Sequence, residues 1–291
     1  MPKPLLTLTQ ANAQRDRRYC RRPNLRLRNV EDIRRFVADV GLCLLFPVQT
    51  IEMPNIYQAV CGRASDTDTS LRDANIGLTW NTKDHALDKR WWYYGKLVKG
   101  KATLVSLELF SSFYALSENY GGLDDYLTEY EAGTLSADAK NIYEALLNEG
   151  RLHAIDLKRK VGLYGDERKG KFDKAINELQ GGLKILPAGV AEAGAWRYAF
   201  IYDLLPRWLP DVSAQARAIS RPQARVNILN QHLRNVIYAT PREISRLFGW
   251  KATETQAAIE ALVATGAAQF GPLVKGLGTG EQADAVIVWS Q

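Results

Sequence analysis

The chain has 291 residues, of which 46% are hydrophobic and 24% charged, and its net charge is +6. This composition is typical of folded domains and excludes a wholly disordered protein, and the length allows two or three domains with cores of their own. Three separate cysteines exclude a dense disulfide framework, and no apolar run has the length of a membrane span or the position of a secretory signal. We therefore expect a cytoplasmic protein with no membrane association.

Positive charge gathers at the N-terminal end. Residues 1–35 hold ten lysines and arginines against three acidic residues, a local charge of +7 in a chain whose net charge is +6. Most of these residues are arginines, whose planar guanidinium binds phosphate oxygens through two parallel hydrogen bonds. The pattern favours nucleic acid as a partner over a solvated arm that only keeps the protein soluble. The arm residues that we expect to contact DNA are Arg15, Arg17, Arg18, Arg21 and Arg22.

Two elements are predicted near the start of the chain. Residues 30–40 carry apolar side chains at the spacing of an amphipathic helix. The apolar run that follows, as far as Pro47, is predicted to be a strand. Residues 64–75 are polar and rich in turn-forming residues, which predicts a loop.

A β-hairpin is predicted over residues 91–109, where side chains alternate on either side of a turn near Lys99 and Gly100. Trp80 and the aromatic residues at 91–94 are expected to be mainly core and cross-strand contacts. The alternative is that these aromatic residues, Trp80 included, stack on an extruded base, and one side of the 91–94 run is expected to face outward. Short helices over residues 110–133 lead into the second half of the chain.

The second half contains one pattern twice. Each copy has three short helices, with starts marked by cap residues such as Ser136, Thr240 and Thr253, followed by two apolar strands. This is the order of a winged-helix domain, a variant of helix-turn-helix. The sequence therefore predicts an α+β fold, mostly helical, of tandem winged-helix domains with short β-hairpin wings. The expected domains are residues 1–134 (a basic arm with a winged-helix-like and β-hairpin region), 135–215 and 216–291.

Two further basic features are candidate DNA contacts. One is the hairpin turn, and the other is the third helix of the first copy, which a helix-turn-helix protein presents to the major groove. The residues concerned are Lys96, Lys99 and Lys101 at the turn, and Arg168, Lys169, Lys171 and Lys174 at the start of the helix. The equivalent helix of the second copy has no basic residue after Lys251 and is predicted to serve packing. We expect the arm, the hairpin and the helix to form one positive concave surface.

Several stretches resemble a known family. They are LTLTQANAQRDRRYC, VEDIRRFVADVGL, WNTKDHAL, WWYYGKLVKGK and FYALSENYGG, followed by the two winged-helix patterns. This combination is similar to the AlkZ/YcaQ-like winged-helix DNA glycosylases, and in particular to a divergent AlkZ-related branch. The resemblance implies a role in DNA repair, with double-stranded DNA, damaged or undamaged, as the partner.

The chain departs from that family at the residues that carry its chemistry. The resemblance places a Gln-apolar-Asp or Gln-apolar-Gln tripeptide just after the Gly-Leu at 41–42, but the positions here read Leu44, Leu45 and Phe46. Hydrocarbon can neither activate water nor stabilise an oxocarbenium ion. Glu52 and His85 are the remaining catalytic candidates, although their residue types and positions favour a surface glutamate and a partly buried or capping histidine over a catalytic role. Whether the protein is an enzyme therefore stays open.

The alternative is a protein without catalytic activity, either a winged-helix transcription regulator or a protein-interaction module. Base release from damaged DNA would distinguish an enzyme from both. The three histidines are scattered without the spacing of a metal site, and the glycines near the C-terminus are not followed by the Lys-Ser/Thr of a phosphate-binding loop. We expect neither a metal nor a cofactor.

Overall fold

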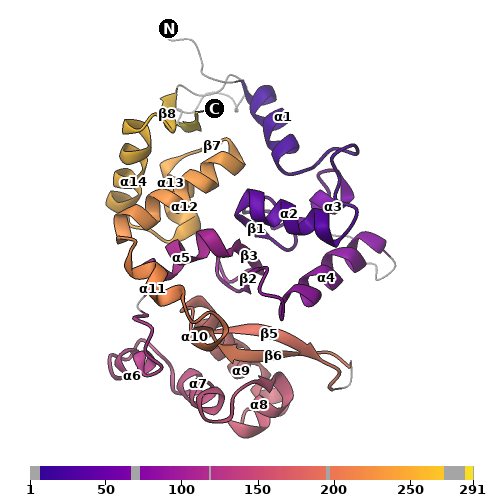
Figure 1. Ribbon diagram of the computed structural model, residues 1–291, viewed down its shortest axis with the longest axis vertical. Helices are drawn as coiled ribbons and strands as arrows, with labels where there is room; N and C mark the ends of the chain where they lie inside the picture. The colour runs from indigo at the N-terminus through magenta and orange to yellow at the C-terminus, as the bar shows by residue number, and fades with distance from the viewer. Residues whose placement is uncertain (1–6, 67–72, 118, 195–196, 272–285, 291) are drawn as a thin grey trace.

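The structure is a computed structural model that describes residues 7–66, 73–117, 119–194, 197–271 and 286–290. The predicted mixture of helix and strand, with helix in the larger share, is confirmed. The strands of the described residues form three small antiparallel sheets of three strands each (Figure 1). In each sheet the strand that comes first in sequence pairs with the last, so the orders are β1-β3-β2, β4-β6-β5 and β7-β9-β8.

Each sheet is built with the same order of elements: helix, strand, two helices, and two strands. The N-terminal unit comprises α2 (Val30–Val40), β1 (Leu42–Leu44), α3 (Ile56–Cys61), α4 (Ala74–Ala86), β2 (Trp92–Gly95) and β3 (Thr103–Ser106). The central unit comprises α7 (Ala137–Glu149), β4 (Leu152–His153), α8 (Ala154–Lys160), the 3-10 turn η1 (Asp166–Arg168), α9 (Lys169–Gly181), β5 (Ile185–Ala191) and β6 (Ala199–Leu204). The C-terminal unit comprises α12 (Arg221–Val236), β7 (Tyr238–Ala239), α13 (Pro241–Phe248), α14 (Ala252–Ala264), β8 (Ala268–Gly271) and β9 (Val286–Trp289).

The remaining helices connect these units or precede them. They are α1 (Leu8–Arg18), α5 (Leu107–Leu116), α6 (Asp125–Glu131), α10 (Leu205–Trp208) and α11 (Val212–Arg217). Of the expected loop over 64–75, residues 67–72 lie outside the described part, and α4 begins at Ala74. The turn of the C-terminal hairpin, residues 272–285, also lies outside it.

Local sequence signals set most of the helix starts. The hydroxyl groups of Ser136 and Thr240 accept hydrogen bonds from the backbone amides of Ala139 and Glu243, which confirms both predicted caps. The predicted cap at Thr253 is wrong: α14 begins at Ala252 with Lys251 as its cap residue. The predicted hairpin is confirmed, but its second strand ends at residue 106. There the side chain of Ser106 caps α5, so residues 107–109 are helical rather than extended.

The aromatic residues of β2 alternate between two cores. Trp92 and Tyr94 pack in the core of the N-terminal unit, whereas Tyr93 faces the other side of the sheet and stacks on Phe110 with ring centroids 4.3 Å apart. The expectation that one side of this strand faces solvent is wrong, because α5 covers the second face of the sheet.

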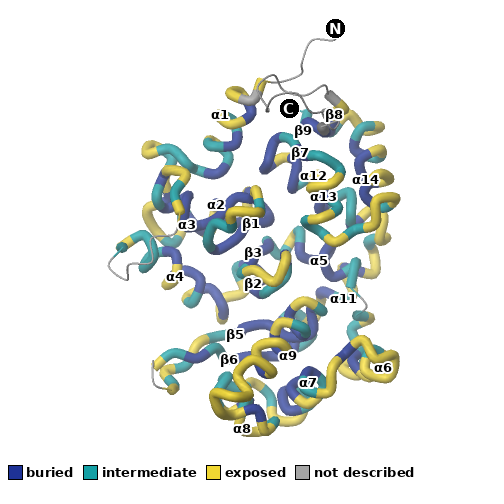
Figure 2. The backbone as a smooth tube through the Cα atoms, turned by 180° about the vertical axis from the view of Figure 1, so that it is seen from behind, coloured by how far each residue is buried: buried dark blue, intermediate teal, exposed yellow. Residues whose placement is uncertain are grey.

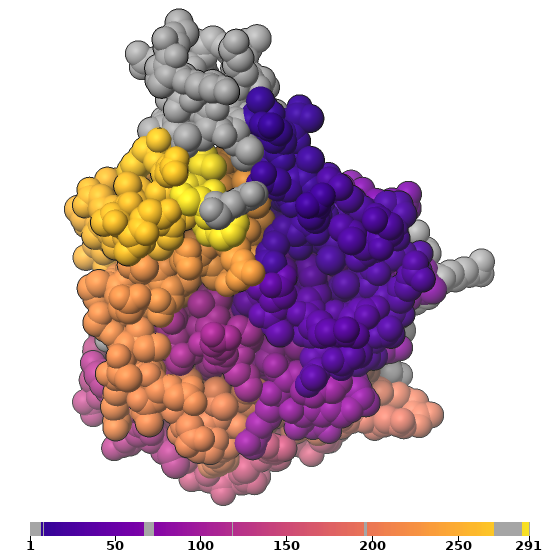
Figure 3. Space-filling view, turned by 45° about the horizontal axis from the view of Figure 1, so that its top comes forward, coloured from indigo at the N-terminus to yellow at the C-terminus, as the bar shows by residue number. Residues whose placement is uncertain are grey.

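That second core joins all three units. It contains Tyr93, Leu186 and Ile228, one from each unit, together with residues of α5 and α11 (Figure 1). The central unit lies at one end of the long axis, and α1 lies at the other end beside the C-terminal unit. Figure 3 shows the N-terminal region lying against the C-terminal unit along a continuous seam. No helix of the described residues is long and apolar enough to cross a bilayer.

Candidate nucleic-acid interface

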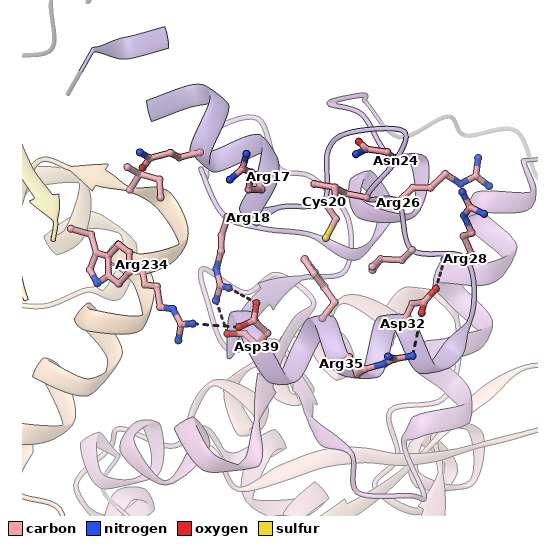
Figure 4. A pocket seen from close by; sticks show the side chains of 16 residues that line it. Arg17, Arg18, Cys20, Asn24, Arg26, Arg28, Asp32, Arg35, Asp39 and Arg234 are labelled. Carbon is pink, nitrogen blue, oxygen red and sulfur yellow. Dashed lines mark hydrogen bonds and ion pairs between the residues drawn. The ribbon is translucent and has the colours of Figure 1, made fainter. Parts of the chain in front are cut away.

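A basic, open cleft of about 840 Å³ lies along this seam. It is bounded by α1, the loop over residues 20–28, α2 and the end of α12, with Trp289 of β9 at its edge. We call it the arginine cleft, because six of its lining residues are arginines and only two are acidic, Asp32 and Asp39 (Figure 4). The arginines are Arg17, Arg18, Arg26, Arg28, Arg35 and Arg234.

The chain forms the floor of the cleft by a tight return after α1. Helix α1 begins at a capping box between Thr7 and Gln10, and it ends at Tyr19, which is fully buried. The loop that follows is anchored by Leu27, whose amide donates to the carbonyl of Ala59 at 3.0 Å. The carboxylate of Asp32 then accepts the backbone amide of Arg28 at 3.0 Å, which fixes the approach to α2.

Two of the arginines hold the seam closed. Arg18 donates to the side chain of Asn235 at 3.1 Å and forms an ion pair with Asp39. The carboxylate of Asp39 also lies 3.5 Å from Arg234, on the other side of the cleft (Figure 4). Burial, and less strongly the neighbouring Arg234, lower the pKa of Arg18, while Asp39 opposes this shift. Asp39 therefore connects the two sides through a shared negative charge.

The other arginines point into or over the cleft with fewer partners. Arg35 is paired with Asp32 at 3.5 Å. The side chains of Arg17, Arg26 and Arg28 are exposed, and they form no ion pair or hydrogen bond within the part of the chain that the structure describes. These three guanidinium groups are available to an anion from solution.

The arginines predicted for DNA contact therefore fall into two groups. Arg17 and Arg18 line the cleft. Arg15 is buried, and its guanidinium donates twice to the carbonyl of Val236, at 3.0 and 2.7 Å. Arg21 pairs with Asp16 at 3.0 Å, and Arg22 donates to the carbonyl of Ala13 at 2.7 Å. The second group is thus bonded within the protein, and Arg15 attaches the arm to the end of α12.

The two other basic features lie elsewhere. Lys99 and Lys101 are exposed at the hairpin turn, whereas Lys96 is half-buried; burial, and then Lys101, lower its pKa. Arg168, Lys169, Lys171 and Lys174 are exposed at the start of α9, and Figure 2 shows exposed residues in yellow along this part of the backbone. Helix α9 and α1 lie towards opposite ends of the molecule (Figure 1). The fold therefore does not gather the arm and the α9 residues on one surface.

The catalytic candidates are also separated from one another. Glu52 is 49% exposed, and its carboxylate forms ion pairs with Arg15 at 3.6 Å and Arg21 at 3.8 Å. His85 is exposed beside Lys89 and the edge of Trp91. Among the described contacts the two candidates share no partner, so they do not form an acid–base pair.

Residues 44–46, where the resemblance leads us to expect the family tripeptide, are apolar in their surroundings as well as in their sequence. Leu44 and Leu45 are each 1% exposed and belong to two different cores. Phe46 is partly buried against the rings of Tyr57 and Trp80. In the described residues no group of three His, Cys, Asp or Glu side chains could hold a metal ion.

Comparison with family models gives one match, to the family described as AlkZ related, over residues 27–249. The chain belongs to the AlkZ-related family. The match runs from the floor of the arginine cleft to the end of α13, so it includes Arg28, Arg35 and Arg234 and excludes α1. No curated protein and no solved structure matches the chain. The family resemblance inferred from the motifs is thereby confirmed.

The sequence alone missed part of this site. Arg26, Arg28 and Arg35 lie in the basic segment, but no local pattern distinguishes them from the arginines that bond internally. Arg234 lies about 200 residues away in a helix with no other special feature. Only the packing of α1 and α2 beside α12 brings it to the cleft, and no local signal in the sequence could have found it.

Proposed function

We propose that this AlkZ-related protein binds double-stranded DNA, damaged or undamaged, and that the arginine cleft is its main phosphate-binding surface. The observation that carries the proposal is the set of three guanidinium groups, Arg17, Arg26 and Arg28, that have no partner in the described chain and lie in one cleft beside paired arginines. The family relation to DNA repair glycosylases supports the same partner. Three free cysteines fit a cytoplasmic location.

The charge of the cleft suits a phosphate backbone. Six arginines against two aspartates leave an excess of four positive charges around one hollow. Each arginine that neutralises a phosphate releases condensed counterions, so the affinity for DNA should fall steeply with salt concentration. Arg18 and Arg234 are held by Asp39, and they keep the cleft in shape while the other arginines bind.

We also propose that the three repeated units are winged helices, with the expected boundaries at residues 134/135 and 215/216. Their shared order of helices and strands supports this, as does the first-third-second strand order of all three sheets. In that arrangement α9 is the third helix of the central unit. Its exposed Lys169 and Lys171 favour a second candidate function, a regulator that reads a DNA groove through α9.

Catalysis of the classical family kind has no support at residues 44–46. Two of these side chains are enclosed in hydrocarbon cores, and the third packs against other rings. We therefore propose that these positions serve packing. Base release from duplexes with alkylated or crosslinked bases tests the remaining candidates, with Glu52→Ala and His85→Ala as the variants. Release that requires either side chain would establish an enzyme.

Fluorescence anisotropy with a labelled duplex at two salt concentrations tests the binding proposal. We expect Arg17→Gln/Arg26→Gln to weaken binding and to lower the slope of log K against log salt by about 0.9 for each phosphate that is no longer neutralised. Lys169→Gln/Lys171→Gln is the matched control, with the same change of charge on α9. Loss of affinity in the control alone, or a strong preference for one undamaged sequence, would favour the groove-reading regulator. If the unaltered protein does not bind the duplex at low salt, both the arginine-cleft proposal and the groove-reading regulator are wrong.

A further inference from the structure

A charged lysine is enclosed by aromatic rings between the N-terminal and central units. Lys83 of α4 has an exposure of 0%. Its ammonium lies 2.5 Å from the carboxylate of Asp84 and donates to the hydroxyl of Tyr198 at 2.7 Å, next to β6. The same hydroxyl donates to Asp84 at 2.8 Å. These contacts satisfy the buried charge and connect the two units.

The ring of Trp80 lies over this group. The Lys83 Nζ atom is 4.0 Å from the centroid of the Trp80 ring, which is a cation–π contact on one face of the indole. Phe46 and Tyr198 approach the same indole with centroids at 6.3 and 6.0 Å. The Trp80 side chain nevertheless remains 39% exposed. One part of the ring is therefore held by the protein while another part faces water.

This arrangement differs from that of other exposed aromatic residues. Tyr120 is 70% exposed, and within the described chain its ring forms no ring or cation contact. The Trp80 ring, in contrast, is already ordered, so a flat ligand that stacks on it does so with little loss of side-chain entropy. Because Asp84 offsets the ammonium of Lys83, the ring has no net charge beneath it. Stacking, rather than charge, is therefore the attraction that it offers.

We propose that Trp80 is a stacking platform for an unstacked nucleobase, in a bulge or in a single strand. The proposal rests on the proposed DNA binding, and it adds a contact to the base to those with the phosphates. Every nucleobase has a π-face, so the platform accepts any base that is free of its own neighbours. A fully paired duplex offers no such base along its length.

The test compares two labelled duplexes that differ in one extrahelical 2-aminopurine. We expect the unaltered protein to bind the bulged duplex at least about 5-fold more tightly than the paired one, as base stacking on an aromatic side chain allows. Binding should also quench the 2-aminopurine fluorescence. Trp80→Ala should abolish the preference and the quenching, and it should leave the affinity for the paired duplex and its salt dependence unchanged. Trp80→Phe should retain part of both effects.

Tyr120→Ala is the control, because it removes an exposed ring that makes no ring or cation contact with the described residues. It should leave the preference for the bulge intact. Equal binding of the two duplexes, or a preference that survives Trp80→Ala, would overturn the platform and leave the arginine cleft standing. Failure of both duplexes to bind at low salt would instead remove the proposed function and the platform together. Circular dichroism confirms folding, and the quenching and the Trp80→Phe variant keep the test decisive if Trp80→Ala does not fold.

Discussion

The buried ammonium of Lys83 makes the stability of this protein depend on pH in a way that one substitution isolates. Burial lowers the pKa of Lys83 from 10.5 to about 8, although the hydrogen bond and charge of Asp84 oppose the shift. Between pH 8 and pH 10.5 the unfolded chain therefore holds a proton that the folded chain has released. Protons favour the unfolded state in this window, so the free energy of unfolding should rise as the pH is raised.

The size of the rise follows from the same two pKa values. A shift of one pKa unit corresponds to about 1.4 kcal/mol, and between pH 7.5 and 9.5 the contribution of Lys83 should change by about 2 kcal/mol. In Lys83→Met this contribution is absent. Titrating groups that do not contact Lys83 are common to both proteins, so their contributions cancel when the two free energies are subtracted.

Urea unfolding followed by circular dichroism at several pH values between 7.5 and 9.5 measures this difference. As the pH is raised from 7.5 to 9.5, we expect the free energy of unfolding of the unaltered protein to increase by about 2 kcal/mol relative to that of Lys83→Met. Lys89→Met is the control, because it removes the same charge from an exposed position of the same region. A constant difference between the unaltered protein and Lys83→Met would show that the ammonium of Lys83 is not penalised by burial, and the reasoning would be wrong.

Three further predictions concern the seam and the loop below the cleft. Arg15→Met should cost about 2–3 kcal/mol by removing both hydrogen bonds to the Val236 carbonyl, with no change in the salt dependence of DNA binding. Burial, and then Arg15, lower the pKa of His232 from 6.5 to about 3. Below pH 6.5 the unfolded state therefore binds a proton that the folded state does not, and the free energy of unfolding should decrease as the pH is lowered. Urea unfolding between pH 6 and 4.5 should show a smaller fall in His232→Leu. Gly62→Ala should cost about 1 kcal/mol more than Gly133→Ala in the same assay, because both have positive φ but only at Gly62 would the added Cβ meet another atom, the Cβ of Arg26 at 2.7 Å.

The sequence predicts well the elements that depend on local patterns. The helix over residues 30–40, the hairpin turn at Lys99 and Gly100, and the caps at Ser136 and Thr240 all rest on interactions within a few residues. The short strands β4 and β7 were missed, because two residues contain no periodicity and each becomes a strand only by pairing with a distant one. The covered second face of the β2 strand was missed for the same reason, since the helix that covers it must first be placed.

The candidate site was predictable in residue type but not in position. A count of charges finds the basic arm, yet it cannot tell Arg17 from Arg15, two residues earlier in the same helix. Arg17 faces solvent, whereas Arg15 is buried and bonded to the carbonyl of Val236. Their different roles come from the face of α1 that meets α12, and the contact of these helices joins residues more than 200 positions apart. Lys83 illustrates the same limit, because its burial depends on the rings of Tyr198 and Phe200, at the start of β6.

Asp39 explains why so basic an arm closes onto the rest of the protein. Its carboxylate binds Arg18 on one side of the seam and lies 3.5 Å from Arg234 on the other, and its carbonyl accepts a hydrogen bond from Arg18 at 2.6 Å. Without that negative charge the two guanidinium groups would repel each other across the cleft. A phosphate carries charge of the same sign as Asp39, so DNA bound along the cleft, as we propose, would add to the attraction that holds its two sides together. A ligand that binds the cleft only when α1 is packed against α12 shifts the equilibrium between the packed and separated states towards the packed one. Such a ligand therefore stabilises the contact between α1 and α12.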